Sequence, residues 1–136
     1  MFCQQPGGRY TPGSKSNAAF RGRTRINYSK PFLSGGYGMA TVVLMICVQP
    51  AIFEELAFRG IVFGALQPTL SATEAVFVSA GMFMILHLSP AAFPHTFAMG
   101  VIAGFLRLRS GSLLPGVLMH FAHNLLCVAL DYSPTG

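Results

Sequence analysis

The chain has 136 residues, of which 52% are hydrophobic and only 10% are charged, with 12 phenylalanines and no tryptophan. A soluble domain carries about 25% charged residues, so this composition excludes an ordinary soluble protein and indicates one integral to a cell membrane or endomembrane. The net charge of +5 is concentrated at one end, because six of the nine basic residues lie in the first 30 residues, with no acid among them.

Residues 1–38 are rich in Gly, Ser, Asn, Pro and Arg and show no hydrophobic periodicity. We predict that they form a disordered basic tail ahead of a membrane core over residues 39–131. The tail is followed by a hydrophobic segment and not by an aromatic-interleaved fold, so we expect no nucleic-acid partner. The lipid bilayer explains the charge better, and the positive-inside rule then places the N-terminus in the cytoplasm.

The first apolar segment extends over residues 39–66 and contains Pro50 near its middle. We predict one long membrane helix with a kink at Pro50. Proline has no backbone donor, so it frees a carbonyl group of the preceding turn. Exposed backbone at membrane depth must face protein or water, and such an arrangement is typical of a helix that lines a cavity.

Two adjacent glutamates and an arginine interrupt this helix. A charged residue at the centre of a membrane helix costs roughly 2.5–3.5 kcal/mol on insertion scales, so it usually pairs or faces a polar cavity. Glu55 and Arg59 are four residues apart, which predicts an ion pair on one face. The Glu54 side chain points about 100° around the helix axis from that of Glu55. It either marks a water-exposed helix end or takes part in chemistry.

Three more apolar helices are predicted. Ser71 and Glu74 form a capping box in sequence, which opens a helix over residues 71–89. Prolines, terminal basic residues and a glycine delimit helices over residues 94–108 and 115–130. The predicted fold class is therefore all-α, a polytopic transmembrane bundle of about four membrane helices. We expect the third helix, which is short, to be the segment that does not cross fully.

The remaining cysteines and histidines have simpler interpretations. Cys3, Cys47 and Cys127 form no CxxC pair, so we expect small buried apolar residues and not disulfides or a thiolate metal site. His95 lies at a loop-to-helix junction and is expected at the membrane interface. His123 is adjacent to Asn124 in sequence, and we expect it to have at most a supporting role there.

Three polar motifs follow one another inside the apolar helices. They are Glu54-Glu55-x-x-x-Arg59, Phe83-x-x-x-His87 and His120-x-x-x-Asn124. In this order they resemble the motifs of the CAAX prenyl protease and bacteriocin-processing (CPBP) family of intramembrane endopeptidases, also called the type II CAAX protease or Abi family. The resemblance covers roughly residues 41–130.

This resemblance implies a hydrolase that cleaves a peptide bond of a membrane-anchored, possibly prenylated CAAX-type protein or of an exported peptide. Glu54 would be the general base that activates a water molecule, and His87 would help to hold that water. His120 and Asn124 would donate hydrogen bonds to the tetrahedral oxyanion. We expect these four side chains to converge on one cavity.

The other residues of the motifs and the use of a metal leave alternatives open. Glu55 and Arg59 would fix the helix and orient Glu54. A metalloprotease mechanism is the alternative, in which Glu54, His87 and His120 hold a Zn²⁺ ion with an open fourth position. The zincin signature HExxH is absent, and a water activated by glutamate needs no zinc, so we favour the mechanism without metal.

The chain departs from the family pattern at its front. Members usually carry further hydrophobic helices before the first motif, where this chain has its polar tail. The chain is then a truncated member, a protein that oligomerises to complete the bundle, or a non-catalytic scaffold or bacteriocin-immunity protein of the same fold. The complete motif set favours the enzyme, because a scaffold has no physical need for four polar groups in the membrane.

Overall fold

The computed structural model describes residues 29–132, which form helices and turns without a β-strand. The predicted all-α class is therefore confirmed for the described residues. Two of their helices are long and apolar enough to cross a membrane, Met39–Leu66 and Pro90–Ser110. The apolar helices Ala72–Leu86 and Leu114–Leu130 are shorter, so a bundle of four membrane spans stays a prediction.

The end of the predicted tail is a short helix, α1 (Lys30–Ser34), which the sequence prediction missed. Proline in its first turn is compatible with a helix start. Phe32 of α1 packs against a core cluster of Val42, Cys47 and Val128. This part of the chain therefore belongs to the fold. The rest of the predicted tail, residues 1–28, lies outside the described residues.

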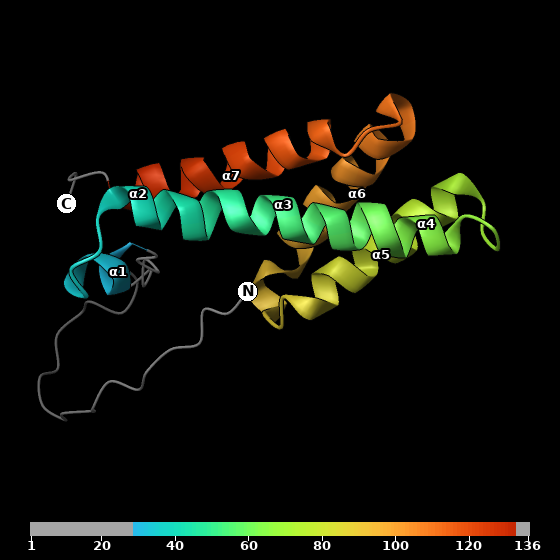
Figure 1. Ribbon diagram of the computed structural model, residues 1–136. Coiled ribbons are helices and arrows are strands. Elements are labelled where there is room, and N and C mark those ends of the chain that lie inside the picture. The colour runs from blue at the N-terminus through green and yellow to red at the C-terminus, as the bar shows by residue number, and fades with distance from the viewer. Residues whose placement is uncertain (1–28, 133–136) are drawn as a thin grey trace, which may run out of the picture.

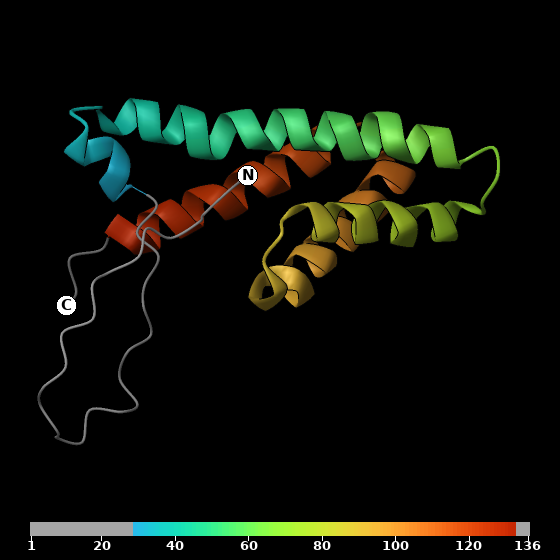
Figure 2. The ribbon, with the colours of Figure 1, turned by 90° about the horizontal axis from the view of Figure 1, so that it is seen from below.

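The segment Met39–Leu66 is one continuous helix whose hydrogen-bonding pattern changes along its length (Figure 1). Three α-helical stretches alternate with two π-helical ones, in the order α2 (Met39–Val42), η1 (Val43–Val48), α3 (Gln49–Glu55), η2 (Leu56–Val62) and α4 (Phe63–Leu66). The predicted long helix is confirmed, but the kink predicted at Pro50 is not seen, because the ribbon runs nearly straight through α3 (Figures 1 and 2). Since π-helical turns occur frequently at functional sites, their position on both sides of α3 is informative.

The remaining helices begin and end close to the predicted signals. They are α5 (Ala72–Leu86), a 3₁₀ turn η3 (Pro90–Ala92), α6 (Phe93–Ser110) and α7 (Leu114–Tyr132). The capping box before α5 is present, since the Ser71 hydroxyl accepts from the Glu74 amide and the Glu74 carboxylate accepts from the Ser71 amide. Gly111 ends α6 in a left-handed conformation with φ 66°.

The third helix was expected to be short and not to cross the membrane fully, and the expected shortness is wrong. With its preceding 3₁₀ turn that helix has 21 residues, whereas α5 has 15. At about 1.5 Å per residue, α5 spans roughly 22 Å, which is less than the ~30 Å hydrocarbon core of a bilayer. The predicted helix, residues 94–108, began at Pro94, whereas the helical segment already begins at Pro90, which is accommodated in the 3₁₀ turn, and Pro94 lies in the first turn of α6.

The long helix organises the other elements (Figures 1 and 2). α7 runs along its first half, where it contacts η1 and α3, and α5 returns along its second half, where it contacts η2 and α4. α6 packs against both α5 and α7. The middle of the long helix, which carries the two glutamates, therefore faces α7.

Glycines on α6 allow α5 and α6 to pack closely. A Cβ atom on Gly100 would lie 2.9 Å from the Ala80 Cβ, and one on Gly104 would lie 2.8 Å from a methyl group of Val76. Such small residues four positions apart are typical of closely packed membrane helices. They bring the α6 backbone within reach of side chains on the long helix.

We expect Gly100→Ala to lower the free energy of unfolding by about 1–3 kcal/mol, because the added methyl group would overlap the backbone and Cβ of Ala80. Gly64→Ala is the matched control, since a Cβ there meets no atom within 4 Å and alanine favours the helix. Thermal unfolding of both variants in detergent measures the difference. Equal stability of the two would contradict the close packing of α5 and α6.

Candidate active site

A buried ion pair forms the centre of the site. Arg59 Nη1 donates to Glu55 Oε1 at 2.9 Å, and the two side chains are only 2% and 1% exposed. Arg59 Nη2 donates to the Gly100 carbonyl at 3.1 Å, and the guanidinium lies over the ring of Phe83, 4.6 Å from its centroid. The ion pair predicted from the spacing is confirmed. It also links the long helix to α5 and α6.

α7 approaches the same carboxylate from its other side. A Cβ atom on Gly116 would lie 2.9 Å from Glu55 Oε2, so only glycine lets the α7 backbone come this close. Within the described residues, Oε2 is buried without a hydrogen-bond partner. All the hydrogen bonds of this carboxylate therefore go through Oε1.

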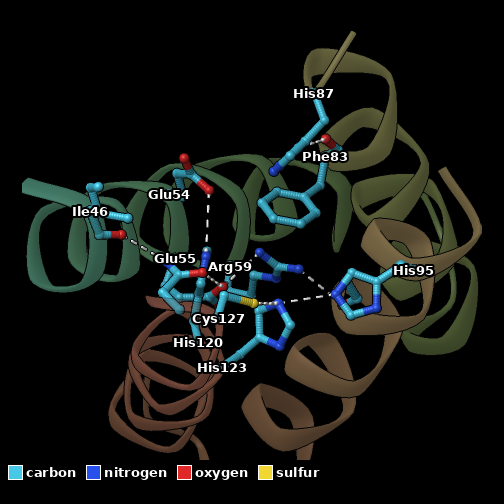
Figure 3. Close-up of polar contacts among 12 residues, drawn as sticks. Ile46, Glu54, Glu55, Arg59, Phe83, His87, His95, His120, His123 and Cys127 are labelled. Carbon is cyan, nitrogen blue, oxygen red and sulfur yellow. Dashed lines mark hydrogen bonds and ion pairs between the residues drawn. The ribbon is translucent and has the colours of Figure 1, made fainter. Parts of the chain in front are cut away.

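His120 of α7 lies between the two glutamates (Figure 3). Its Nδ1 is 3.2 Å from Glu55 Oε1, its Nε2 is 3.7 Å from Glu54 Oε2, and the residue is 4% exposed. An ionised carboxylate only accepts hydrogen bonds, so Nδ1 donates to Glu55. Glu55 thereby fixes the orientation of the ring and directs Nε2 towards Glu54.

The two adjacent glutamates have different surroundings. The Glu54 side chain is 21% exposed, whereas that of Glu55 is 1% exposed. Neighbouring residues of a helix point about 100° apart, so one carboxylate enters the packed interior and the other stays at its edge. Glu54 is therefore the more exposed glutamate of this pair.

His87 follows the last residue of α5 and turns back onto its own helix. Its Nδ1 donates to the Phe83 carbonyl at 2.8 Å, which leaves Nε2 as the nitrogen available to other groups. The Phe83 ring contacts both histidines, with centroid distances of 4.5 Å to His87 and 6.0 Å to His120. Figure 3 shows the His87 ring directed towards the side on which Glu54 lies.

Asn124 lies one turn after His120 on α7 and contacts the first half of the long helix. Its Nδ2 donates to the Ile46 carbonyl in η1 at 3.2 Å. The structure thus brings Glu54 and His120 together, places His87 beside them across Phe83, and attaches Asn124 to the backbone of η1.

The zinc ligand set inferred from the resemblance is not assembled in this geometry. Among residues 29–132, no group of three or more His, Cys, Asp or Glu side chains is close enough to hold a metal ion. Glu54 and His120 provide two neighbouring donor groups. We therefore derive no chemical step through a metal.

Sequence reasoning missed a second polar cluster. His95 Nε2 at the start of α6 lies 3.0 Å from His123 Nε2 on α7, and the Cys127 sulfur lies 3.5 Å from the same His123 nitrogen. The four-residue spacing of His123 and Cys127 was a usable signal, but no local pattern connects His95 to them. Cys47 is buried among apolar residues as predicted, whereas Cys127 is only half-buried. Cys3 lies outside the described residues.

One comparison with known proteins identifies a family. The model of one protein family, described as type II CAAX prenyl endopeptidase Rce1-like, matches residues 37–126. The matched range is about two thirds of the chain and contains all three polar motifs. No curated protein and no solved structure matches the chain.

Proposed function

Because the chain belongs to the Rce1-like family of type II CAAX prenyl endopeptidases, we propose that it is an intramembrane endopeptidase. The family is one of membrane-integral proteases, and the two helices long enough to cross a membrane agree with that setting. The proposed substrate is a peptide bond of a membrane-anchored protein, of the prenylated CAAX type or an exported peptide. Membership of a protease family supports the enzyme over the scaffold that the motifs alone left open.

The observation that carries the proposal is the different placement of the two glutamates. Glu55 is buried and paired with Arg59, so its charge is already balanced inside the protein. Glu54 is partly exposed and lies beside His120 Nε2. A scaffold needs only the buried ion pair, whereas a hydrolase also needs a carboxylate that meets water.

Peptide hydrolysis can then proceed by general base catalysis. Glu54 takes a proton from a water molecule while the water oxygen bonds to the carbonyl carbon of the substrate. His87 and Glu54 together hold this water. The carbonyl oxygen becomes an oxyanion, which accepts hydrogen bonds from the second N–H of the Asn124 amide and from Nε2–H of a doubly protonated His120, whose Nδ1–H stays bonded to Glu55.

The second half of the reaction returns the proton. The C–N bond breaks as Glu54 passes its proton to the leaving nitrogen, so the products are a carboxylic acid and an amine and the enzyme regains its starting state. Glu55 and Arg59 take no proton in this scheme. They hold the ring of His120 and the α6 backbone in place.

The proposal is tested with purified full-length protein in liposomes and two reporter peptides of identical sequence, one prenylated at a CAAX cysteine and one unmodified. We expect hydrolysis of the prenylated peptide, seen by mass spectrometry as a new C-terminus, and slower hydrolysis of the unmodified one. Cleavage of the unmodified peptide alone would overturn the CAAX substrate class. No cleavage of either peptide or of an exported leader peptide by well-folded protein would favour the non-catalytic scaffold.

A further inference from the structure

Two glycines lie against the two members of the buried ion pair. On α6, a Cβ atom added to Gly100 would lie 3.3 Å from Arg59 Nη2. On α7, a Cβ atom added to Gly116 would lie 2.9 Å from Glu55 Oε2 and 3.5 Å from Glu55 Cδ. The ion pair is almost fully buried, and a closely packed interior leaves it little room to move away from an added methyl group. The two glycines therefore let α6 and α7 enclose the ion pair.

Gly116 also lies one helical turn before His120. Residues four positions apart share one face of an α-helix, with a rise of about 6 Å between them. The Glu55 carboxylate lies across this turn of α7, with Oε2 facing Gly116 and Oε1 3.2 Å from His120 Nδ1 (Figure 3). Because a single turn of helix joins the two positions, the approach of α7 at Gly116 also sets the distance between the imidazole ring and Glu55.

The two oxygens of Glu55 are used unequally. Oε1 contacts both Arg59 Nη1, at 2.9 Å, and His120 Nδ1, whereas Oε2 is buried without a hydrogen-bond partner among residues 29–132. A buried acceptor without a partner costs free energy, so the close approach of α7 does not serve stability alone. What this approach provides is the contact between Oε1 and His120.

We infer that Gly116 is a positioning residue for His120. With no side chain at the contact with Oε2, it lets α7 approach until Glu55 Oε1 reaches Nδ1 of the ring. The ring then directs Nε2 to the side of Glu54, 3.7 Å from the Oε2 of that residue. The inference rests on the proposed function where it concerns catalysis, but the position of the ring can be tested without activity.

Nuclear magnetic resonance of the histidine rings tests the positioning directly. The chain has four histidines, so protein labelled at histidine nitrogen gives few signals, and His120→Gln identifies the signal of His120. We expect its Nδ1–H proton to be shifted strongly downfield by the hydrogen bond to a carboxylate. In Gly116→Ala this signal should move upfield or disappear. An unchanged signal in folded Gly116→Ala, or no downfield signal in the parent, would overturn the inference.

The matched control is Gly64→Ala on the long helix. A Cβ atom at Gly64 meets no atom within 4 Å, so this variant should keep the downfield signal of His120 and the parental rate of hydrolysis. Loss of the signal in Gly64→Ala as well would show that any added methyl group disturbs the ring, and would contradict a specific role for Gly116.

A double-mutant cycle of Gly116→Ala and Glu55→Asp tests the contact through which Gly116 acts. Aspartate is one methylene shorter, so it withdraws the carboxylate from the position that the added Cβ would overlap. Gly116→Ala should lower the melting temperature by several degrees in the parent and much less in the Glu55→Asp background. The folded fraction in detergent replaces the melting temperature for a variant that is too unstable to melt. The same loss in both backgrounds would overturn the inference.

Hydrolysis of the prenylated peptide tests the consequence for catalysis. We expect Gly116→Ala to lower kcat per folded molecule about 10-fold with an unchanged KM, because a hydrogen bond to a charged group is weakened and Gly116 does not bind the substrate in the proposed mechanism. The double variant Glu55→Asp/Gly116→Ala should recover folded protein without recovering kcat, because aspartate does not reach His120. Recovery of kcat together with folding would indicate a purely structural role and contradict the inference.

The outcomes separate the positioning role from the proposed function. Parental kcat in folded Gly116→Ala together with a reduced kcat in His120→Gln would overturn the positioning role and leave the proposed function intact. Parental kcat in His120→Gln would overturn the oxyanion role of His120, while the histidine signal and the unfolding cycle would still show whether Gly116 positions the ring.

Discussion

Glu55→Gln is expected to remove most of the folded protein. Glutamine has nearly the same shape but no charge, so Arg59 would stay buried at 2% exposure without a counter-charge. Removal of one member of a buried ion pair costs about 3–5 kcal/mol, a large part of a typical stability of about 5–15 kcal/mol. The folded fraction after membrane extraction, measured by size-exclusion chromatography in detergent, reports this loss.

Two further variants show whether the unbalanced charge is the cause. Glu74→Gln makes the same chemical change at the exposed capping box of α5 and should leave the folded fraction close to that of the parent, because no buried charge depends on it. The double variant Glu55→Gln/Arg59→Met removes both charges and should recover part of the folded fraction, because a buried pair can often be replaced by apolar groups. Parental abundance and melting temperature of Glu55→Gln would contradict a structural role for the pair.

Glu54→Gln is expected to abolish activity without loss of folded protein. The glutamine amide keeps the size of the side chain but has almost no basicity, so it cannot take a proton from water. General bases contribute typically 10²- to 10⁴-fold to rate, and we expect kcat to fall by at least this factor. The Glu54 side chain is 21% exposed and the ion pair of Glu55 is untouched, so the melting temperature should change little.

The control for this variant is again Glu74→Gln, which should retain the parental kcat and KM. A second comparison is Glu54→Asp, which keeps the base but withdraws it by about one methylene. We expect residual activity between that of the parent and that of Glu54→Gln, because proton transfer requires hydrogen-bond contact with the water. Lower activity of Glu54→Asp than of Glu54→Gln would speak against a base at this position.

Features encoded within one or two helical turns could be predicted from the sequence. The pairing of Glu55 with Arg59 follows from a four-residue spacing, and the start of α5 follows from Ser71 and Glu74. In both cases the partners lie on the same turn or the next, so backbone geometry alone brings them together. The end of α6 at Gly111 and the start of α7 near Pro115 were predictable for the same reason.

Contacts between helices could not be derived in this way. The position of His120 between Glu54 and Glu55, 65 residues from the latter, depends on how α7 is rotated and where it crosses the long helix. The two π-helical stretches also shift the faces of the long helix away from a regular 100° spacing. Resemblance to a family indicated that these residues belong together, but it did not show that Glu55 also holds His120.

The hydrogen bond of Asn124 to Ile46 is an intermediate case. The sequence predicted that Pro50 frees a carbonyl of the preceding turn, but it gave no sign of the π-helical stretch η1, which changes which carbonyl is affected. Nothing in the sequence indicated that the Asn124 side chain would donate to the Ile46 carbonyl. The pair His95 and His123 was missed for the same reason, since 28 residues separate the two side chains.

The assignment of the catalytic base is tested most directly by hydrolysis of the prenylated peptide per folded molecule, measured in parallel for the parent, Glu54→Gln and Glu55→Gln. We predict that Glu54→Gln is well folded and at least about 100-fold slower than the parent, whereas the small folded fraction of Glu55→Gln hydrolyses the peptide faster than Glu54→Gln does. The opposite result, a parental rate in Glu54→Gln beside a well-folded but inactive Glu55→Gln, would show that Glu55 is the base and that the roles of the two glutamates are reversed.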